Sequence, residues 1–381
     1  MATNSSIRLP WVDHLRTLMI VLVVNLHACV SYSHVGDWYF MSAQEPTLAA
    51  KVPFIVWQAH LQSFFMGLLF FISAYFAYGS LARHGTRAFV RERLVRLGLP
   101  ALLYMLVIHP FILLVLNPWN HDFGAPITFY VNYLFTGRFL GASGPLWFAV
   151  ALLIFCLALA GWRAMRPLPA SVDATQPAVP SGTFLLLFAL AIGLGSFAVR
   201  LVQPIGTNVL NMQLCFFVQY VTFFLAGLHA ARHGWLLPLA QSSRARIAGW
   251  LALFGGPTLL LAIMFIGAKT APPEAFFGGW RWQAFGYAMW EQLAGVGLSL
   301  GLLALFSRNF NFERPWLRWL ADRSFGVYCL HAPVIIALAM LYRALPQNMY
   351  ALVALLTVTG LTFSFILADI GRRLPGLRRI L

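Results

Sequence analysis

The residues of this sequence best suited to chemistry lie in the first apolar run and directly before it. Asp13 precedes Arg16 by three positions, and His27 follows Arg16 by eleven. At 100° per residue of an α-helix, Arg16 and His27 differ by about 20° around the axis, and Asp13 lies within about 60°. The spacing predicts one polar stripe in which His27 is roughly 16 Å deeper than Arg16. Because an imidazole exchanges protons near neutral pH, such a stripe is suited to acid–base catalysis.

A structural interpretation accounts for part of this stripe. Arg16 is explained as a charged anchor at a membrane surface, with Asp13 as its ion-pair partner. His27 is not explained in this way, because an ionisable group at membrane depth is costly unless it is paired or hydrated. We therefore take His27 as the primary catalytic candidate, with Arg16 and Asp13 beside it.

A second basic pair, Arg93 and Arg96, stands at positions i and i+3 in the segment RERLVRLGLP. Paired guanidinium groups of this kind bind phosphates through bidentate hydrogen bonds, for example the phosphates of coenzyme A. Two interpretations stay open on spacing alone, a phosphate site and a positively charged membrane anchor. For the neighbouring Arg87 and Arg91, the anchor is sufficient.

Other ionisable residues in apolar segments are weaker candidates. His331 lies in the segment SFGVYCLHAPV, and Glu291 is an acidic residue inside an apolar run, where it could line a water-filled cavity. For His60 and His109 we expect structural roles. The four cysteines are scattered without a CxxC pair, so the sequence indicates neither disulfides nor a bound metal or cofactor.

The elements that position these residues are predicted to be membrane-spanning helices. Sixty per cent of the 381 residues are hydrophobic and only 10% are charged, too few charges to cover a soluble domain. A spanning helix needs about 20 apolar residues. Runs near or above that length occupy 17–36, 52–82, 97–121, 139–162, 174–199, 201–231, 247–268, 282–307, 324–342 and 344–368. The sequence therefore predicts an all-α bundle of about ten transmembrane helices, in which residues 1–381 form one domain.

The basic residues alternate between the segments that connect these runs. If the N-terminus is cytoplasmic, 20 of the 26 Lys and Arg residues fall in inner segments. This bias predicts that both termini lie in the cytoplasm. It also explains the net charge of +15 as a topology signal, with a lipid bilayer as the partner and no role for nucleic acid.

Three segments outside the predicted helices have distinct expectations. The Pro-, Ala- and Ser-rich stretch at about 167–183 is predicted to be a flexible cytoplasmic loop. In the outer loop 117–144, the apolar centre 126–135 is too short to span a membrane and is expected at its interface. The run 17–36 lacks an A-x-A-type cleavage site, so we expect a retained helix and not a signal peptide.

Five segments resemble motifs of the acyltransferase-3 family, the ten-helix membrane O-acyltransferases. The segment LPWVDHLRTLMIVLVVNLHA (9–28) places Asp13, Arg16 and His27 at that family's Asp-x-x-Arg and downstream His, and Arg93 and Arg96 match its Arg-x-x-Arg. The other three are FFISAYFAY (70–78), with Ala74 where the family usually has Gly, GPLWFAVALL (144–153) with Trp147, and SFGVYCLHAP (324–333) with His331. The motifs occur in family order over almost the whole chain.

The resemblance implies an activity and a location. The family transfers acyl groups to glycans and other acceptors outside the cytoplasm, and residues 30–48 are similar to its glucan-modifying, succinyl-transferring branch. It implies an acyl-CoA-type donor, here acetyl or succinyl, a glycan or glucan acceptor and a bacterial inner membrane. His27, Arg16 and Asp13 would be catalytic, with His27 as general base or acyl carrier. Arg93 and Arg96 would bind the donor.

Two other classes of function compete with this one. A proton-coupled transporter or flippase would use His27, His331 and Glu291 to relay protons. The absence of an internal sequence repeat argues against a transporter built from inverted repeats. A non-catalytic partner in a glycan-synthesis complex would leave the buried His27 unexplained. Turnover of an acyl-CoA thioester by the purified protein distinguishes these classes.

Overall fold

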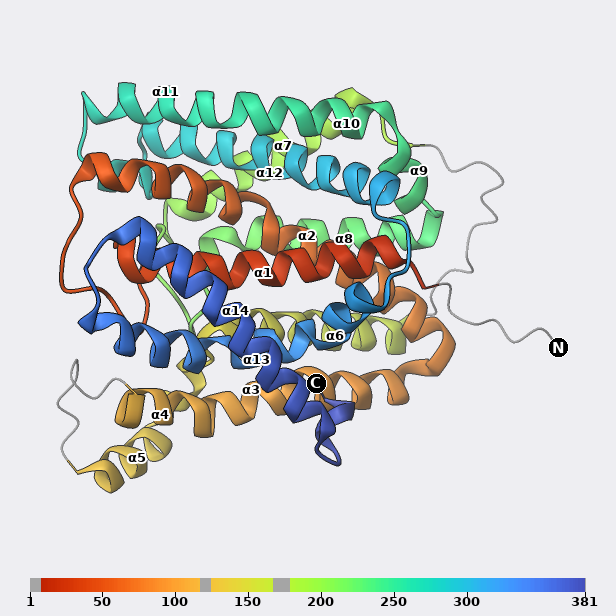
Figure 1. Cartoon of the computed structure of the whole chain (residues 1–381). Helices are drawn as coiled ribbons and strands as arrows, with labels where there is room; N and C mark the ends of the chain where they lie inside the picture. The colour runs from red at the N-terminus through yellow and green to blue at the C-terminus, as the bar shows by residue number, and fades with distance from the viewer. Residues whose placement is uncertain (1–7, 117–124, 167–178, 381) are drawn as a thin grey trace.

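The computed structural model describes residues 8–116, 125–166 and 179–380, which are mostly helical (Figure 1). In these ranges no β-strand forms, and the only β-type pairing is an isolated bridge between Val209 and Met212. The main helices are α1 (Pro10–Ser33), α2 (Leu48–Arg93), α5 (Pro126–Phe135), α6 (Trp147–Met165), α7 (Gly182–Arg200), α8 (Phe217–His233), α9 (Leu236–Gln241), α10 (Ser243–Trp250), α11 (Gly256–Ala268), α12 (Trp282–Asn309), α13 (Pro315–Leu341) and α14 (Met349–Arg373).

Nine helices in the described ranges are long and apolar enough to cross a membrane. One of them, Leu48–Leu116, contains two crossings, because the chain reverses at Gly85. Gly85 has φ 74°, a conformation that residues with a side chain rarely adopt. Before this glycine the chain runs from left to right in Figure 1, and after it the chain returns. The two limbs raise the number of crossings to ten, which confirms the predicted all-α membrane bundle.

The returning limb is not a regular α-helix. The short α-helices α3 (Leu99–Leu103) and α4 (His109–Phe111) alternate with π-helical turns at Leu94–Gly98, Tyr104–Ile108 and Ile112–Leu116. Pro110 has no N–H group, so the carbonyls of Met105 and Leu106 lose their helical donor. Two tyrosines of α5 replace it. Tyr133 donates to the Met105 carbonyl at 2.5 Å, and Tyr130 donates to the Leu106 carbonyl at 3.0 Å.

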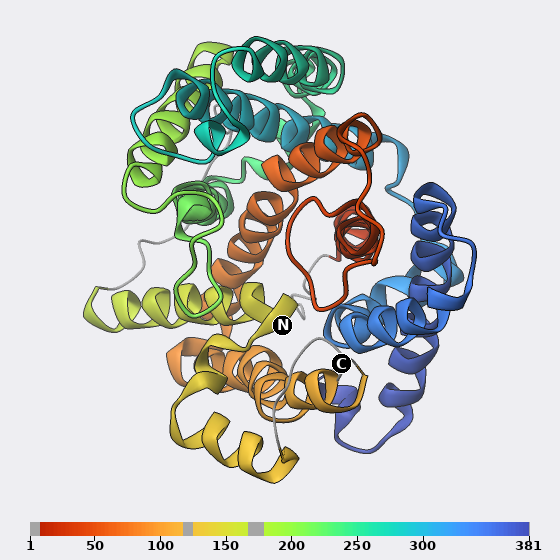
Figure 2. The same ribbon diagram turned by 90° about the vertical axis from the view of Figure 1, so that its left-hand side faces the viewer.

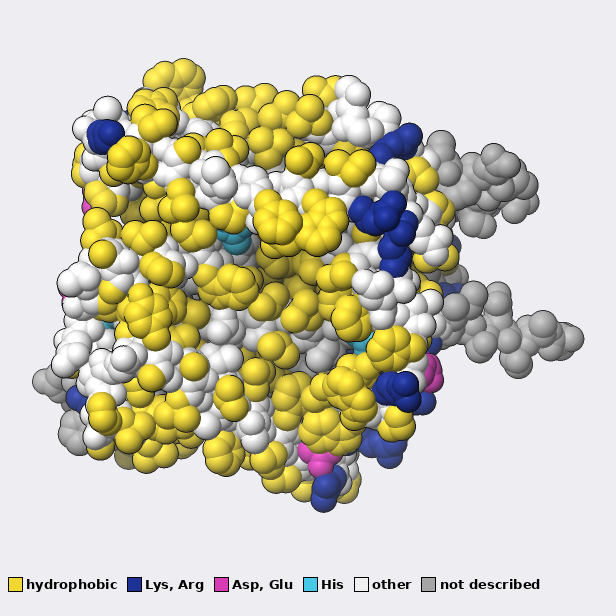
Figure 3. All heavy atoms as spheres, turned by 45° about the horizontal axis from the view of Figure 1, so that its top comes forward, with side chains coloured by type: hydrophobic (Ala, Val, Ile, Leu, Met, Phe, Trp, Pro, Cys, Tyr) yellow, Lys and Arg dark blue, Asp and Glu magenta, His cyan; other side chains and the backbone are white. Residues whose placement is uncertain are grey.

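The surface matches a protein surrounded by lipid. In Figure 3 hydrophobic side chains cover most of the visible surface, and most of the Lys and Arg side chains gather at the end where α1 begins. We call this the basic end, since α2, α6, α8 and α12 also terminate there (Figure 1). Ten crossings return the end of α14 to the side where α1 begins. That this side faces the cytoplasm stays a prediction from the basic residues.

The segments that connect the membrane crossings differ in detail from those predicted from the sequence. The segment 126–135 forms the short helix α5, whose Ile127 and Phe135 are 81% and 89% exposed, as expected for a helix at the interface. The predicted run 201–231 is not one helix, because residues 201–213 form turns and α8 begins at Phe217. Residues 167–178 of the predicted cytoplasmic loop lie outside the described part of the chain.

The helix that carries the catalytic candidate lies inside the bundle. Helix α1 packs against α2, α12, α13 and α14, and Figure 2 shows it between α2 and α13. Its apolar residues Trp11, Leu15, Met19 and Val24 are fully buried. Tight packing on several sides fixes the rotation of α1 and thereby the direction of its polar stripe.

Candidate active site

Three aromatic rings meet near the end of the bundle opposite the basic end. The His27 ring of α1 stacks on Trp38, with 3.8 Å between ring centroids and 19° between planes. His331 of α13 stacks beside His27 at 5.2 Å and 20°. Trp38 belongs to the loop 34–47, which reaches from α1 toward the centre of this end (Figure 2). Three segments distant in sequence thus enclose two imidazoles.

His27 and His331 each have one ring nitrogen without a hydrogen-bond partner among the described residues. Nδ1 of His331 lies 2.8 Å from the carbonyl oxygen of Tyr328, which can only accept, so Nδ1 carries the proton of the neutral ring. His331 Nε2 therefore holds a lone pair, and it has no partner among the described residues. His27 Nδ1 is also buried without a partner in that part of the chain. Buried polar atoms are normally paired, so these two nitrogens indicate a place for a polar ligand.

A hydrogen bond close to His331 holds helix α13 in place. The hydroxyl of Tyr328 donates to the carbonyl of Pro145 at 2.5 Å and ties α13 to the turn before α6. In that turn Gly144 has φ 49°, and a Cβ atom there would approach the Tyr104 ring to 2.5 Å. Only glycine fits this close approach.

Trp147, which follows that turn, belongs to a neighbouring aromatic group. Its ring stacks on Tyr220 at 5.6 Å, and the Tyr220 hydroxyl accepts a hydrogen bond from Gln62 at 3.0 Å. The ring contacts of Trp147 are with Phe148, Phe217 and Tyr220, and not with either histidine. The structure thus brings His331 to His27 but places Trp147 in the adjoining layer.

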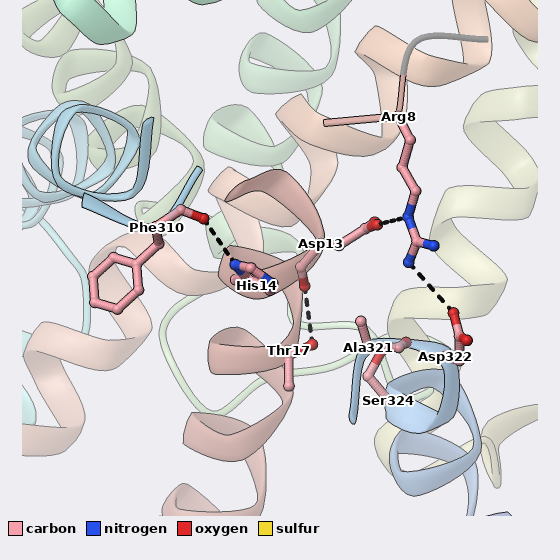
Figure 4. Close-up of polar contacts among 8 residues, drawn as sticks. All are labelled: Arg8, Asp13, His14, Thr17, Phe310, Ala321, Asp322 and Ser324. Atoms are coloured by element: carbon pink, nitrogen blue, oxygen red, sulfur yellow. Dashed lines mark hydrogen bonds and ion pairs between the residues drawn. The ribbon is translucent and has the colours of Figure 1, made fainter. Parts of the chain in front are cut away.

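At the basic end, Asp13 does not have the predicted partner. Its carboxylate accepts a hydrogen bond from Nε of Arg8 at 2.6 Å, and Arg8 also approaches Asp322 of α13 at 3.4 Å (Figure 4). The prediction that Asp13 fixes the Arg16 guanidinium is therefore wrong in its partner. Arg8 precedes the helix, so helical spacing gave no indication of this pairing. Arg8 instead bridges Asp13 of α1 and Asp322 of α13.

Three guanidinium groups gather near the start of the stripe. Arg16 interacts electrostatically with Arg93, Arg96 and Asp13, although Arg93 and Arg96 are about 80 positions away in the sequence. The Arg16 side chain is exposed between the buried Leu15 and Thr17. Arg96 also lies 3.5 Å from Glu92. Like charges repel, so a cluster of this kind is typical of a site that binds an anion such as phosphate.

Glu291 lies in a separate polar cluster. It forms an ion pair with Arg200 at 2.6 Å, and the two side chains are 1% and 0% exposed. Gln292 also donates to this carboxylate at 2.8 Å, and Gln219 donates to Gln292 at 2.7 Å. Arg200 falls between the predicted runs 174–199 and 201–231, but in the structure it ends α7 and is fully buried. The cluster joins α7, α8 and α12.

We expect this ion pair to be needed for stability. Replacing Glu291 by Gln leaves the Arg200 charge buried without a counter-charge, which typically costs about 3–5 kcal/mol. The variant should melt well below the wild type in detergent. Replacing both residues by Met should restore most of the stability, because no charge stays buried.

The matched control for this prediction is Glu45→Gln. Glu45 pairs with Lys51 at 2.7 Å but is 71% exposed, so its loss should leave the melting temperature unchanged within error. Equal shifts for Glu291→Gln and Glu45→Gln would contradict the role assigned to the buried pair.

One mostly apolar cavity does not contain the candidate residues. It has a volume of about 370 Å³ and lies between α2, α7, α8 and α12, with mostly apolar walls that include Phe71, Phe188 and Trp235. Neither histidine of the ring stack nor any arginine of the cluster lines it. Its wall includes the imidazole of His229, which lies apart from the residues described above.

Sequence reasoning missed the loop contribution to the site. Trp38 and Tyr39 lie in the segment GDWYF, and His109, which was predicted to be structural, bonds the Tyr39 hydroxyl through Nδ1 at 2.8 Å. Tyr104 donates to the same hydroxyl at 3.2 Å. Adjacent aromatic residues in a short loop were the one signal available, since loops commonly carry functional residues.

Comparison with known proteins assigns this chain to a family. The chain matches the acyltransferase domain family over residues 9–369. It is 24% identical over 378 residues to glucans biosynthesis protein C of Salmonella gallinarum, which covers 97% of this chain and 93% of that protein. It has the same identity, over 381 residues, to the proteins of that name from Salmonella typhi and Salmonella typhimurium.

No solved structure is significantly similar to this chain. The family match spans nearly all of the described crossings, including α1 with His27 and α13 with His331. It confirms the predicted family, and it agrees with a membrane bundle that buries two imidazoles and gathers arginines at its basic end. The chain therefore belongs to the acyltransferase family and is an integral membrane O-acyltransferase.

Proposed function

We propose that this protein transfers an acyl group, acetyl or succinyl, from a cytoplasmic acyl-CoA-type donor to a hydroxyl group of a glucan on the other side of the bacterial inner membrane. The observation that carries the proposal is the pair His27 and His331, stacked at 5.2 Å, each with a buried nitrogen that has no partner in the described part of the chain. Glucans as acceptors are supported by the names of the relatives.

Arg16, Arg93 and Arg96 bind the donor in this proposal. Their guanidinium groups gather at the basic end and suit the phosphates of coenzyme A. His27 lies roughly 16 Å further along α1 than Arg16. The phosphates can thus stay at the membrane surface while an extended arm carries the thioester to His27.

The acyl group moves in one step that His27 assists. His27 accepts the proton of an acceptor hydroxyl as the oxygen attacks the thioester carbonyl carbon. The carbon–sulfur bond breaks, the ester forms, and the sulfur leaves as a thiol after taking up the proton. The lone pair on Nε2 of His331 accepts a hydrogen bond from a second hydroxyl of the glucan and orients it.

A proton-coupled transporter would need Glu291 as one of its three proton-relay groups. Glu291 is engaged by Arg200 and Gln292 in a cluster of its own, so it does not extend a proton path from His27 and His331. The acyltransferase proposal uses the two histidines and the arginine cluster together, and it needs no role for Glu291 beyond stability.

The direct test uses purified wild-type protein in detergent with succinyl-CoA or acetyl-CoA and a glucan oligosaccharide. We expect release of free coenzyme A thiol together with a mass increase of the oligosaccharide by one acyl group. Failure to consume either thioester, with correctly folded protein, would contradict the proposal.

A further inference from the structure

The loop that carries Trp38 is fixed to the bundle at both ends. The backbone N–H of Ser42 donates to the carbonyl of Ser31 at 2.9 Å, and Nε2 of His34 lies 2.9 Å from the Ser42 carbonyl. Lys51 pairs with Glu45 at 2.7 Å near the start of α2. These contacts hold the two ends of the loop 34–47 but do not reach its central residues.

The centre of the loop is attached to the bundle through the Tyr39 hydroxyl. Its hydroxyl lies 2.8 Å from Nδ1 of His109 and accepts a hydrogen bond from Tyr104 at 3.2 Å. Since the Tyr104 proton is directed at Tyr39, the Tyr39 proton is free to bond His109. Both partners belong to the irregular limb after Gly85, so the bonds join this limb to the loop after α1.

The same limb presents these partners because of its irregular turns. The π-helical turn Tyr104–Ile108 comes directly before His109, and such turns occur frequently at functional sites. Tyr133 of α5 stabilises the turn by bonding the Met105 carbonyl, and its ring stacks on His109 at 6.0 Å. Helix α5 thus supports His109 from the outside.

Tyr39 is linked directly to the catalytic candidate through Trp38. The two neighbouring rings meet edge to face at 5.0 Å, and Trp38 covers His27 at 3.8 Å. The Trp38 ring also lies 6.5 Å from His331 with 10° between planes. Because Tyr39 contacts Trp38, the bond between Tyr39 and His109 helps to hold the Trp38 ring against His27.

We propose that Tyr39 and His109 form a latch that holds Trp38 over His27 and keeps water from the thioester. The proposal rests on the acyl-transfer function proposed above, and the three residues are positioning residues in it. When the latch is open, water takes the place of the acceptor hydroxyl and attacks the carbonyl carbon. The carbon–sulfur bond breaks, and a free acid and a thiol form. The latch favours transfer over this hydrolysis.

The test compares hydrolysis with transfer in the same protein. Tyr39→Phe and His109→Phe each remove one side of the latch while keeping a ring. With succinyl-CoA or acetyl-CoA and a glucan oligosaccharide, each variant should raise the ratio of hydrolysis to transfer by about three- to tenfold, the usual value of one hydrogen bond. The double variant should match Tyr39→Phe, because Tyr39→Phe already removes the bond to His109.

The matched control is Tyr342→Phe, which removes a tyrosine hydrogen bond of similar length, 2.9 Å to Thr359 of α14. It should leave the ratio unchanged. General destabilisation lowers hydrolysis and transfer together, so the ratio separates a positioning role from a structural one. An unchanged ratio in Tyr39→Phe and His109→Phe, with normal wild-type turnover, would overturn the latch.

A second measurement does not depend on activity. Hydrogen–deuterium exchange should be faster at residues 34–47 in Tyr39→Phe and His109→Phe than in the wild type, and unchanged there in Tyr342→Phe. Equal exchange in all four proteins would also overturn the latch. A wild-type protein that turns over no thioester would instead contradict the proposed function, while the exchange measurement still decides on the latch.

Discussion

Replacing His27 by Ala is expected to reduce acyl transfer by about 10²- to 10⁴-fold, the usual contribution of a general base. His27 is placed between Trp38 and His331, and its Nδ1 has no partner in the described part of the chain, so the loss removes a reactive group and not a structural bond. Membrane insertion should be preserved, because a helix without an imidazole inserts more easily.

The measurement is the rate of acyl transfer at saturating donor, together with the yield of folded protein. His60→Ala is the matched control, since His60 is a buried histidine that bonds the Val56 carbonyl of its own helix at 2.7 Å. This control should keep transfer close to that of the wild type. Activity of His27→Ala within tenfold of the wild type would exclude the general-base role.

Replacing Arg93 or Arg96 by Lys is expected to raise the apparent KM for acyl-CoA by about tenfold or more. An ammonium group keeps the charge but does not reproduce the two parallel hydrogen bonds of a guanidinium to a phosphate. The KM for the glucan acceptor should stay unchanged, because the arginines lie at the basic end and the proposed function brings the acceptor in from the opposite end.

The control for this second prediction uses Arg87 and Arg91 of the same helix. Both are exposed, and a membrane anchor needs only positive charge, so Lys should replace either one without effect. If Lys is tolerated equally well at all four positions, the arginines serve only to orient the protein in the membrane. Equal loss at all four would indicate a diffuse basic surface and no defined pocket.

Local periodicity predicted those parts of the site that lie along one helix. The spacing of Arg16 and His27 was sufficient to place them on one stripe, because helical geometry fixes their relative direction. Arg93 and Arg96 were identified from their spacing and from the family resemblance. The apolar runs likewise predicted the crossings, since the length of a spanning helix is set by the membrane.

Contacts between distant segments were not predictable in this way. Asp13 bonds Arg8 and not Arg16, and Glu291 bonds Arg200, which lies 91 positions earlier in the sequence. The Trp38 ring covers His27 because the loop 34–47 folds back onto the bundle. His109 bonds this loop from a limb whose direction is set by π-helical turns. Such pairings arise from tertiary packing, which the pattern of a single helix does not contain.

The most direct test of the central claim is transfer across a sealed membrane. The protein is reconstituted in vesicles with its basic end outward and a glucan oligosaccharide inside, and labelled succinyl-CoA or acetyl-CoA is added outside only. We expect labelled ester on the enclosed oligosaccharide with the wild type, and none above background with His27→Ala. Label on the enclosed oligosaccharide with both proteins, or with neither, would contradict acyl transfer through the His27 site.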